Sequence, residues 1–199
     1  MKRLIRVGIL LIVLAIPALI FLFLHGFGKN KFEVPVFYSD GTPAGLEGCG
    51  DRLVPHVITR FPCAKEAATR NSISLIWVVP EMEETNLQLA EIINRLHARF
   101  DYTNHVRIAI VIADEIMDAF SGRFLGTENS SEQMEIFACS SEAVKDFIDC
   151  QLLLNREYRT FPVVVIDGKG LIRGYFNVID PKEMERIDAE VKILLNDYE

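Results

Sequence analysis

The stretch that decides the fold is Val163–Phe176, VVVIDGKGLIRGYF. It begins with a short apolar, β-branched run, Val163–Asp167, and continues with Gly168, Lys169 and Gly170. The glycines supply the backbone freedom of a tight turn between two extended segments. This pattern predicts a β-hairpin made of Val163–Asp167 and Leu171–Phe176.

Two further apolar runs precede the hairpin, Ile73–Val79 (ISLIWVV) and Val106–Ala113 (VRIAIVIA). Nearly continuous β-branched runs of this length are typical of strands that are buried on both faces of a sheet with parallel pairs. The sequence therefore predicts a partly parallel sheet that needs cover on both sides.

Amphipathic stretches alternate with these runs. One lies near Glu84–Phe100, a second covers Ser141–Leu154 after a middle strand, and a third follows Asp180 as N-cap with Pro181 at the first helical position. The resulting order is strand–helix–strand, then a middle strand and helix, then hairpin and helix. This order predicts an α/β fold of the thioredoxin-like class, a mixed sheet flanked by helices.

The N-terminus carries a different signal. Val7–Leu24 is an uncharged run of 18 residues, about 27 Å long as a helix, which is enough to cross a bilayer. Lys2, Arg3 and Arg6 precede it, so the positive-inside rule predicts a single-pass anchor with a cytoplasmic N-terminus and a periplasmic or extracytoplasmic C-terminal domain. A cleaved signal peptide is the alternative, but its apolar region is usually about 7–15 residues long. A lipoprotein is disfavoured because the first cysteine is Cys49.

We therefore divide the chain into residues 1–28 (cytoplasmic tip and transmembrane anchor), 29–53 (linker and glycine-rich loop) and 54–199 (thioredoxin-like domain). Short extended stretches are expected at Val34–Tyr38 and Val54–Phe61. Residues 32–199 hold 16 basic and 28 acidic side chains, a net charge of −12. An acidic domain of this kind repels phosphate backbones, so nucleic acid is not expected as a partner.

The four cysteines, Cys49, Cys63, Cys139 and Cys150, belong to a domain that we expect to be exported, where disulfides persist. Four cysteines allow three complete pairings. A Cys139–Cys150 bond is disfavoured because a helix starting near Ser140 would hold the two residues about 13–15 Å apart. Cys49–Cys63 is the favoured candidate disulfide, and a metal held by Cys49, His56 and Cys63 is disfavoured because their spacing matches no short zinc pattern.

Pro162, in the stretch Tyr158–Val163 (YRTFPV) just before the hairpin, resembles the cis-proline that thioredoxin-fold proteins place beside their active site. The wider pattern is similar to the Sco-type (SenC-like) proteins that assist copper delivery to cytochrome c oxidase. The hairpin sequence, the stretch Met134–Leu154 and the Val54–Val57 entry (VPHV) carry this resemblance, which covers roughly residues 54–195. It implies an anchored, exported thioredoxin-like domain.

The family's chemistry does not carry over. A Cys-x-x-x-Cys pair should follow the first buried strand, but Met82 and Asn86 stand at the matching positions, and Arg159-Thr160 stands where the third copper ligand, a histidine, should lie. Cu(I) prefers thiolate and imidazole ligands, so we expect no metal site and no cofactor, copper being disfavoured, and no catalytic residues.

The resemblance then implies a non-catalytic assembly or interaction factor, or an accessory subunit, of a membrane complex, with cytochrome oxidase or a related respiratory complex as the partner. A thiol-disulfide oxidoreductase or copper metallochaperone that uses Cys49 and Cys63 is the alternative.

Overall fold

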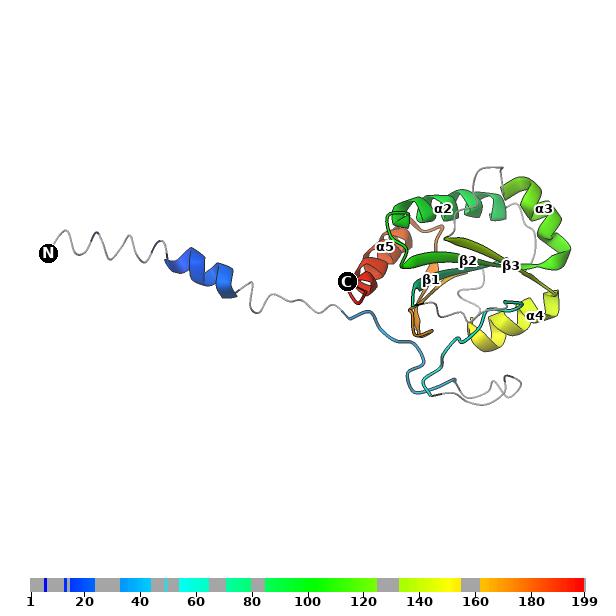
Figure 1. Cartoon of the computed structure of the whole chain (residues 1–199), viewed down its shortest axis with the longest axis horizontal. Coiled ribbons are helices and arrows are strands. Elements are labelled where there is room, and N and C mark those ends of the chain that lie inside the picture. The colour runs from blue at the N-terminus through cyan, green and yellow to red at the C-terminus, as the bar shows by residue number, and fades with distance from the viewer. Residues whose placement is uncertain are drawn as a thin grey trace. The chain divides into compact units, whose positions relative to one another are not determined.

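The computed structural model describes residues 6, 13, 15–23, 33–43, 49, 54–64, 71–79, 85–124, 133–154 and 162–198, without the side chains of 85–90, 122–124 and 162. The chain divides into two compact units, Met1–Glu33 and Val34–Glu199. The second unit holds the sheet (Figure 1).

The sheet contains five strands in the order β3-β2-β1-β4-β5. They are β1 (Ile73–Val79), β2 (Val106–Ala113), β3 (Met134–Cys139), β4 (Pro162–Ile166) and β5 (Ile172–Asn177). β1, β2 and β3 pair in parallel, and β4 runs antiparallel to β1 and β5. This mixed sheet with helices on both faces is a thioredoxin-like arrangement, and the predicted hairpin and the predicted bounds of β1 and β2 are confirmed.

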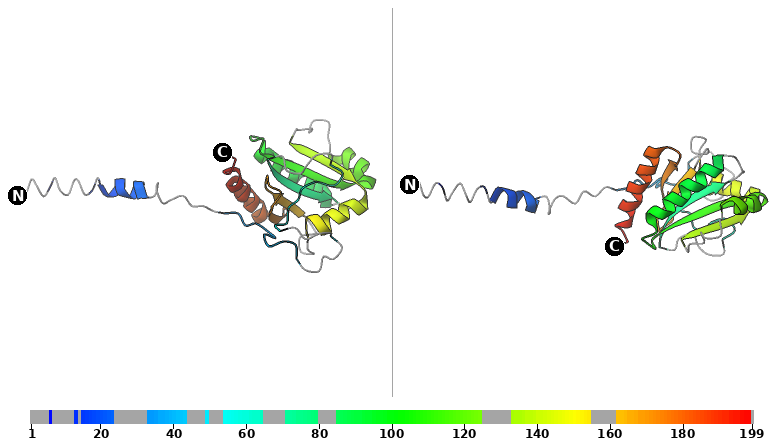
Figure 2. Two further views of the ribbon diagram at one scale, coloured as in Figure 1. Left: turned by 60° about the horizontal axis from the view of Figure 1, so that its bottom comes forward. Right: turned by 90° about the horizontal axis from the view of Figure 1, so that it is seen from above.

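One face of the sheet is covered by three helices, α2 (Thr85–Phe100), α3 (Asp114–Phe124) and α5 (Pro181–Leu195), which lie together on one side in Figures 1 and 2. The alternation along each strand directs every second side chain to this face. These strand residues, among them Leu75, Trp77 and Ile110, pack against Leu96, Phe120 and Val191 of the helices in one cluster.

The opposite face has less helical cover. A short helix, α4 (Ser141–Asp146), runs directly into a π-helical turn, η1 (Phe147–Gln151). The described residues of 34–64, which we call the strap, complete the cover: Ile58 and Phe61 are buried with Val144 and Phe147 against β1 and β2. Two strap backbone amides bond to the hairpin, Phe37 N to Ile172 O at 2.9 Å and Ile58 N to Gly170 O at 2.9 Å.

Two expectations from the sequence need correction. The strap contributes no strand of its own: Val34–Tyr38 and Val54–Phe61 are turns and irregular backbone, apart from an isolated bridge at Arg60. The helix expected over Ser141–Leu154 is α-helical only to Asp146 and ends as a π-turn at Gln151.

Helix α3 was not predicted. It begins directly at the end of β2, and its first turn holds Asp114 and Glu115, which the helix dipole favours. Its apolar stripe consists of Ile116, Met117 and Phe120, too short a pattern to stand out from the sequence alone.

Within the first unit, residues 15–23 are helical. Their large apolar side chains, Ile16, Leu19, Ile20, Phe21, Leu22 and Phe23, are at least half exposed. Among the described residues, no helix is long and apolar enough to cross a membrane. Residues 7–12, 14 and 24 of the predicted anchor lie outside that described part.

Leu96 tests the packing of α2 on the sheet because its side chain is fully buried. We expect Leu96→Ala to lower the free energy of unfolding by about 2–5 kcal/mol, since it removes buried methyl groups and leaves a cavity. Asn94→Ala, an exposed position on the same helix, should change it by less than about 0.5 kcal/mol. Urea unfolding with the disulfides intact measures both, and equal effects would contradict this packing.

Candidate functional site

The positions matched to the family's active site lie mostly beyond what the structure describes. Met82, Arg159 and the Phe161–Pro162 peptide bond fall outside the described residues, so the predicted cis-proline remains a prediction. Asn86 is the second residue of α2, with its side chain undescribed. Pro162 opens β4 and pairs with Asn177. The described geometry instead brings together the cysteines, His56 and the end of η1.

The cysteine pairing differs from the predicted one. Cys49 bonds to Cys150, with Cα atoms 5.1 Å apart, and Cys63 bonds to Cys139, with Cα atoms 5.9 Å apart. The Cys49–Cys63 prediction was therefore wrong, whereas the argument against Cys139–Cys150 is confirmed. The prediction relied on the short separation of Cys49 and Cys63 in the sequence. In the structure, the two cysteines of the strap contact different elements, η1 and the end of β3.

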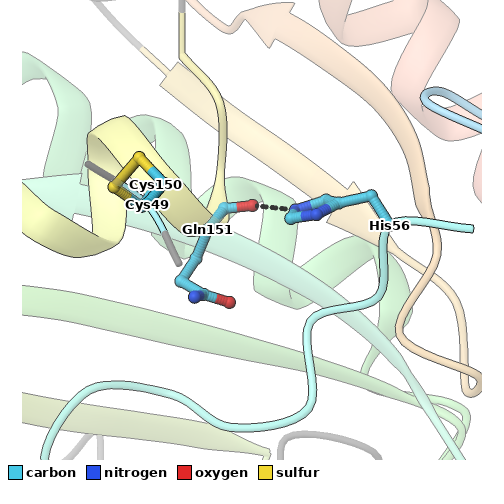
Figure 3. The surroundings of a disulfide bond; sticks show 4 residues. All are labelled: Cys49, His56, Cys150 and Gln151. Atoms are coloured by element: carbon cyan, nitrogen blue, oxygen red, sulfur yellow. Dashed lines mark hydrogen bonds between the residues drawn. A yellow bond between two sulfur atoms is a disulfide. The ribbon is translucent and has the colours of Figure 1, made fainter. Parts of the chain in front are cut away.

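His56 fixes the strap beside the first of these disulfides (Figure 3). Its ring is buried, and Nε2 donates a hydrogen bond to the carbonyl oxygen of Gln151 at 2.7 Å. Gln151 follows Cys150 directly, so a covalent bond and a hydrogen bond hold the strap to adjacent residues. Within the described part of the chain, the buried Nδ1 has no hydrogen-bond partner.

A second side chain completes the end of η1. The hydroxyl of Tyr175, from β5, donates to the carbonyl oxygen of Leu152 at 2.6 Å. The last carbonyls of a helix lack partners inside the helix, and here His56 and Tyr175 satisfy two consecutive ones. Leu153 then leaves the turn with a positive φ of 52°. The π-turn is thus held by groups distant in sequence.

Arg107 contacts the strap from β2. Its side chain, in β2, is buried beneath the strap: Nε donates to Ser74 Oγ at 2.7 Å, and Nη1 lies 3.5 Å from Glu135 Oε2 of β3. The guanidinium also lies 5.2 Å from the centre of the Phe61 ring, a cation–π geometry. This buried charge has a carboxylate partner, as a buried charge requires.

The turn of the hairpin, which carries part of the family resemblance, has a structural explanation. Asp167 Oδ1 accepts from the backbone amides of Lys169 and Leu171, and Oδ2 pairs with Arg173 at 3.0 Å. Arg173 Nη2 also donates to the carbonyl oxygen of Val34 at 2.6 Å. The Asp and Arg of VVVIDGKGLIRGYF therefore shape a turn and hold the start of the strap.

Gly168 in this turn faces the C-terminal residues of the domain. Its amide donates to the Tyr198 hydroxyl at 2.7 Å, and a Cβ at this position would collide with that oxygen. Burial raises the pKa of Tyr198 above its ordinary value, because it disfavours the charged phenolate.

The chemistry available to this assembly is limited. All four cysteines of the chain are oxidised in the two disulfides. Among the described residues, no group of three or more His, Cys, Asp or Glu side chains could hold a metal ion. At the family's copper positions, Met82 offers a single thioether, which can contact Cu(I), whereas the amide of Asn86 and the guanidinium of Arg159 offer no soft ligand beside it. The arrangement crosslinks and positions the strap.

This chain is similar in structure, but only weakly in sequence, to proteins of known structure. No protein-family model and no curated protein matches the chain. Solved structures do: BsSco, a member of the Sco family of cytochrome c oxidase assembly proteins, is 10% identical over 80% of this chain and 94% of its own, with a TM-score of 0.48.

A SCO1/SenC family lipoprotein from Bacillus anthracis is 14% identical over 63% of this chain and 83% of its own, with a TM-score of 0.45. ScoI from Bradyrhizobium japonicum, with copper bound, is 14% identical over 65% and 92%, with a TM-score of 0.41. Sco/SenC proteins are thus among the structural neighbours of this chain.

The cysteine pairing can be checked directly. Non-reducing proteolysis and mass spectrometry should yield peptides joined through Cys49–Cys150 and Cys63–Cys139. Replacing Cys49 and Cys150 by alanine should lower the free energy of unfolding by about 2–4 kcal/mol, because the crosslink closes a long loop in the unfolded chain. A peptide joining Cys49 to Cys63 would contradict the structure.

Proposed function

We propose that this chain is a membrane-anchored, extracytoplasmic protein whose thioredoxin-like domain acts as a non-catalytic assembly or interaction module of a membrane-protein complex. The observation that carries the proposal is the use of the cysteines. All four form crosslinks between the strap and α4–η1 or β3, so the oxidised domain holds no free thiol for exchange or for soft-metal binding.

The membrane anchor rests on the N-terminal unit. Residues 15–23 form a helix that exposes large apolar side chains, and a helix that is apolar all round needs a non-aqueous surrounding. Lys2, Arg3 and Arg6 precede this segment, which supports a cytoplasmic N-terminus. The two disulfides support an oxidising compartment for the domain.

The kind of partner rests on the sequence resemblance to Sco-type proteins. We propose a membrane complex of respiratory type, cytochrome oxidase in particular. A strongly acidic domain, with a net charge of −12 over residues 32–199, suits association with proteins and not with nucleic acid.

The alternative function, an oxidoreductase or metallochaperone based on a Cys49/Cys63 pair, loses its basis. A dithiol site needs two cysteines that can bond to one another, and here each is bonded to a different distant residue, Cys150 or Cys139.

The anchor and its orientation give a topological prediction. In intact spheroplasts, protease added from outside should digest the domain and leave a short membrane-bound fragment containing residues 7–24. In a Lys2→Cys variant, a membrane-impermeant thiol reagent should label position 2 only after the cells are lysed. A soluble mature form beginning near residue 25–30 would show that the segment is a cleaved signal instead.

The non-catalytic role is tested by deleting the gene and restoring it with variants. We expect the deletion to lower the amount of one membrane complex on blue-native gels, and the full-length wild type to co-migrate with that complex. Cys49→Ala/Cys150→Ala and Cys63→Ala/Cys139→Ala should each restore the complex at growth temperatures below the unfolding transition of the variant, where it is folded. A folded variant that cannot restore it would indicate thiol chemistry, and an unchanged set of complexes would overturn the proposal.

A further inference from the structure

A groove lies on the helical face of the domain, between α2 and the turn that leads from β5 into α5. Its volume is about 420 Å³, within the range of about 300–1,000 Å³ common for ligand sites. The apolar lining includes Ile92 of α2, Ile179 and Pro181 of the turn, and Met184 of α5. Ile179 is 37% exposed, so the groove presents an apolar surface to solvent.

Two arginines form the α2 wall of this groove. Arg95 and Arg99 are one helical turn apart and follow Ile92 at spacings of three and seven residues, so all three share one face of the helix. Arg95 Nε makes one long contact with the carbonyl of Glu91, 3.4 Å away on the same helix. In the described part of the chain, neither guanidinium forms an ion pair.

These arginines are unusual in their setting. Arg186, an exposed arginine of α5, is in contrast paired with Glu183 and Glu190. Arg99 also lies in the last turn of α2, where a cation compensates the helix dipole, but Arg95 lies one turn earlier. Glu185 is the one carboxylate in the groove lining, and it comes from α5, so an acidic ligand group is favoured on the α2 side.

We propose that this groove binds a peptide segment of the membrane partner in which apolar side chains are followed by acidic ones. The apolar side chains would pack on Ile92, Ile179 and Met184, and the acidic ones would pair with Arg95 and Arg99. The charge pattern favours this occupant, because Arg95 and Arg99 place two positive charges beside the apolar lining of a domain whose net charge over residues 32–199 is −12. This inference rests on the proposed function and names the surface through which it acts.

Because the partner is a protein in its native membrane, the test uses the full chain there. A photo-crosslinker, p-benzoyl-phenylalanine, replaces Ile179 in the groove, and in a matched control it replaces Glu142, an exposed residue on α4 at the opposite face of the sheet. We expect the Ile179 position alone to crosslink to a protein of the complex, and mass spectrometry to place the crosslink in an apolar–acidic segment.

Charge variants test the arginines. Arg95→Glu/Arg99→Glu should lower the crosslink yield at least about fivefold, because charged groups at the rim of an interface steer association, and Arg95→Lys/Arg99→Lys should retain most of it. Lys145→Glu/Lys169→Glu makes the same change in net charge at exposed positions away from the groove, and should leave the yield unchanged. Thermal unfolding of each variant checks the fold.

The outcomes separate this inference from the proposed function. If the protein co-migrates with a complex but Ile179 crosslinks only to lipid, to a second copy of the chain or to a segment without acidic residues, the groove proposal fails and the module proposal stands. A yield that is insensitive to Arg95→Glu/Arg99→Glu in a folded variant overturns it as well. If no complex contains the protein, the proposed function fails first.

Discussion

The burial of β1 and β2 on both faces is the constraint on which the rest of this domain depends. Every residue of these two strands is buried, so each face of the sheet must be covered along its length. In the described part of the chain, three helices cover one face, and the other face has a six-residue α-helix and a π-turn. The strap closes that face, and an irregular segment without strands of its own must therefore be held by side chains and disulfides.

The bonds that hold the strap are distributed along its whole course. Arg173 binds its beginning at Val34, His56 and the Cys49–Cys150 bond join it to η1, and the Cys63–Cys139 bond ends it at β3. Along the strap, polar and covalent contacts alternate. Each of them joins the strap to a strand of the sheet or to η1. The four cysteines thus join the strap to η1 and to the end of β3.

The sequence predicted the central parts of the fold well and the strap poorly, for physical reasons. β1 and β2 were located to the residue because strands buried on both faces have continuous apolar runs with sharp ends, and α5 because Asp180 and Pro181 mark its start. The strap has no periodic pattern, so nothing local shows where it lies. Its cysteine partners, 76 and 101 residues away, depend on the completed fold, as does the π-turn, whose end is held by His56 and Tyr175.

Arg95 and Arg99 were not predicted as site residues from the sequence, because an exposed basic pair on a helix looks ordinary until Ile179 and Met184 are placed opposite it.

The order of the cysteines along the chain makes the two disulfides nested, with Cys63–Cys139 inside the loop closed by Cys49–Cys150. Once the inner bond exists, the path from Cys49 to Cys150 runs through fourteen residues to Cys63 and eleven from Cys139. On the chain-entropy scale the outer bond then contributes about 3.5 kcal/mol in place of about 4.7 kcal/mol for a loop of its full length. The contributions of the two crosslinks to stability are therefore not additive: when one is lost, the other closes a longer loop and contributes more.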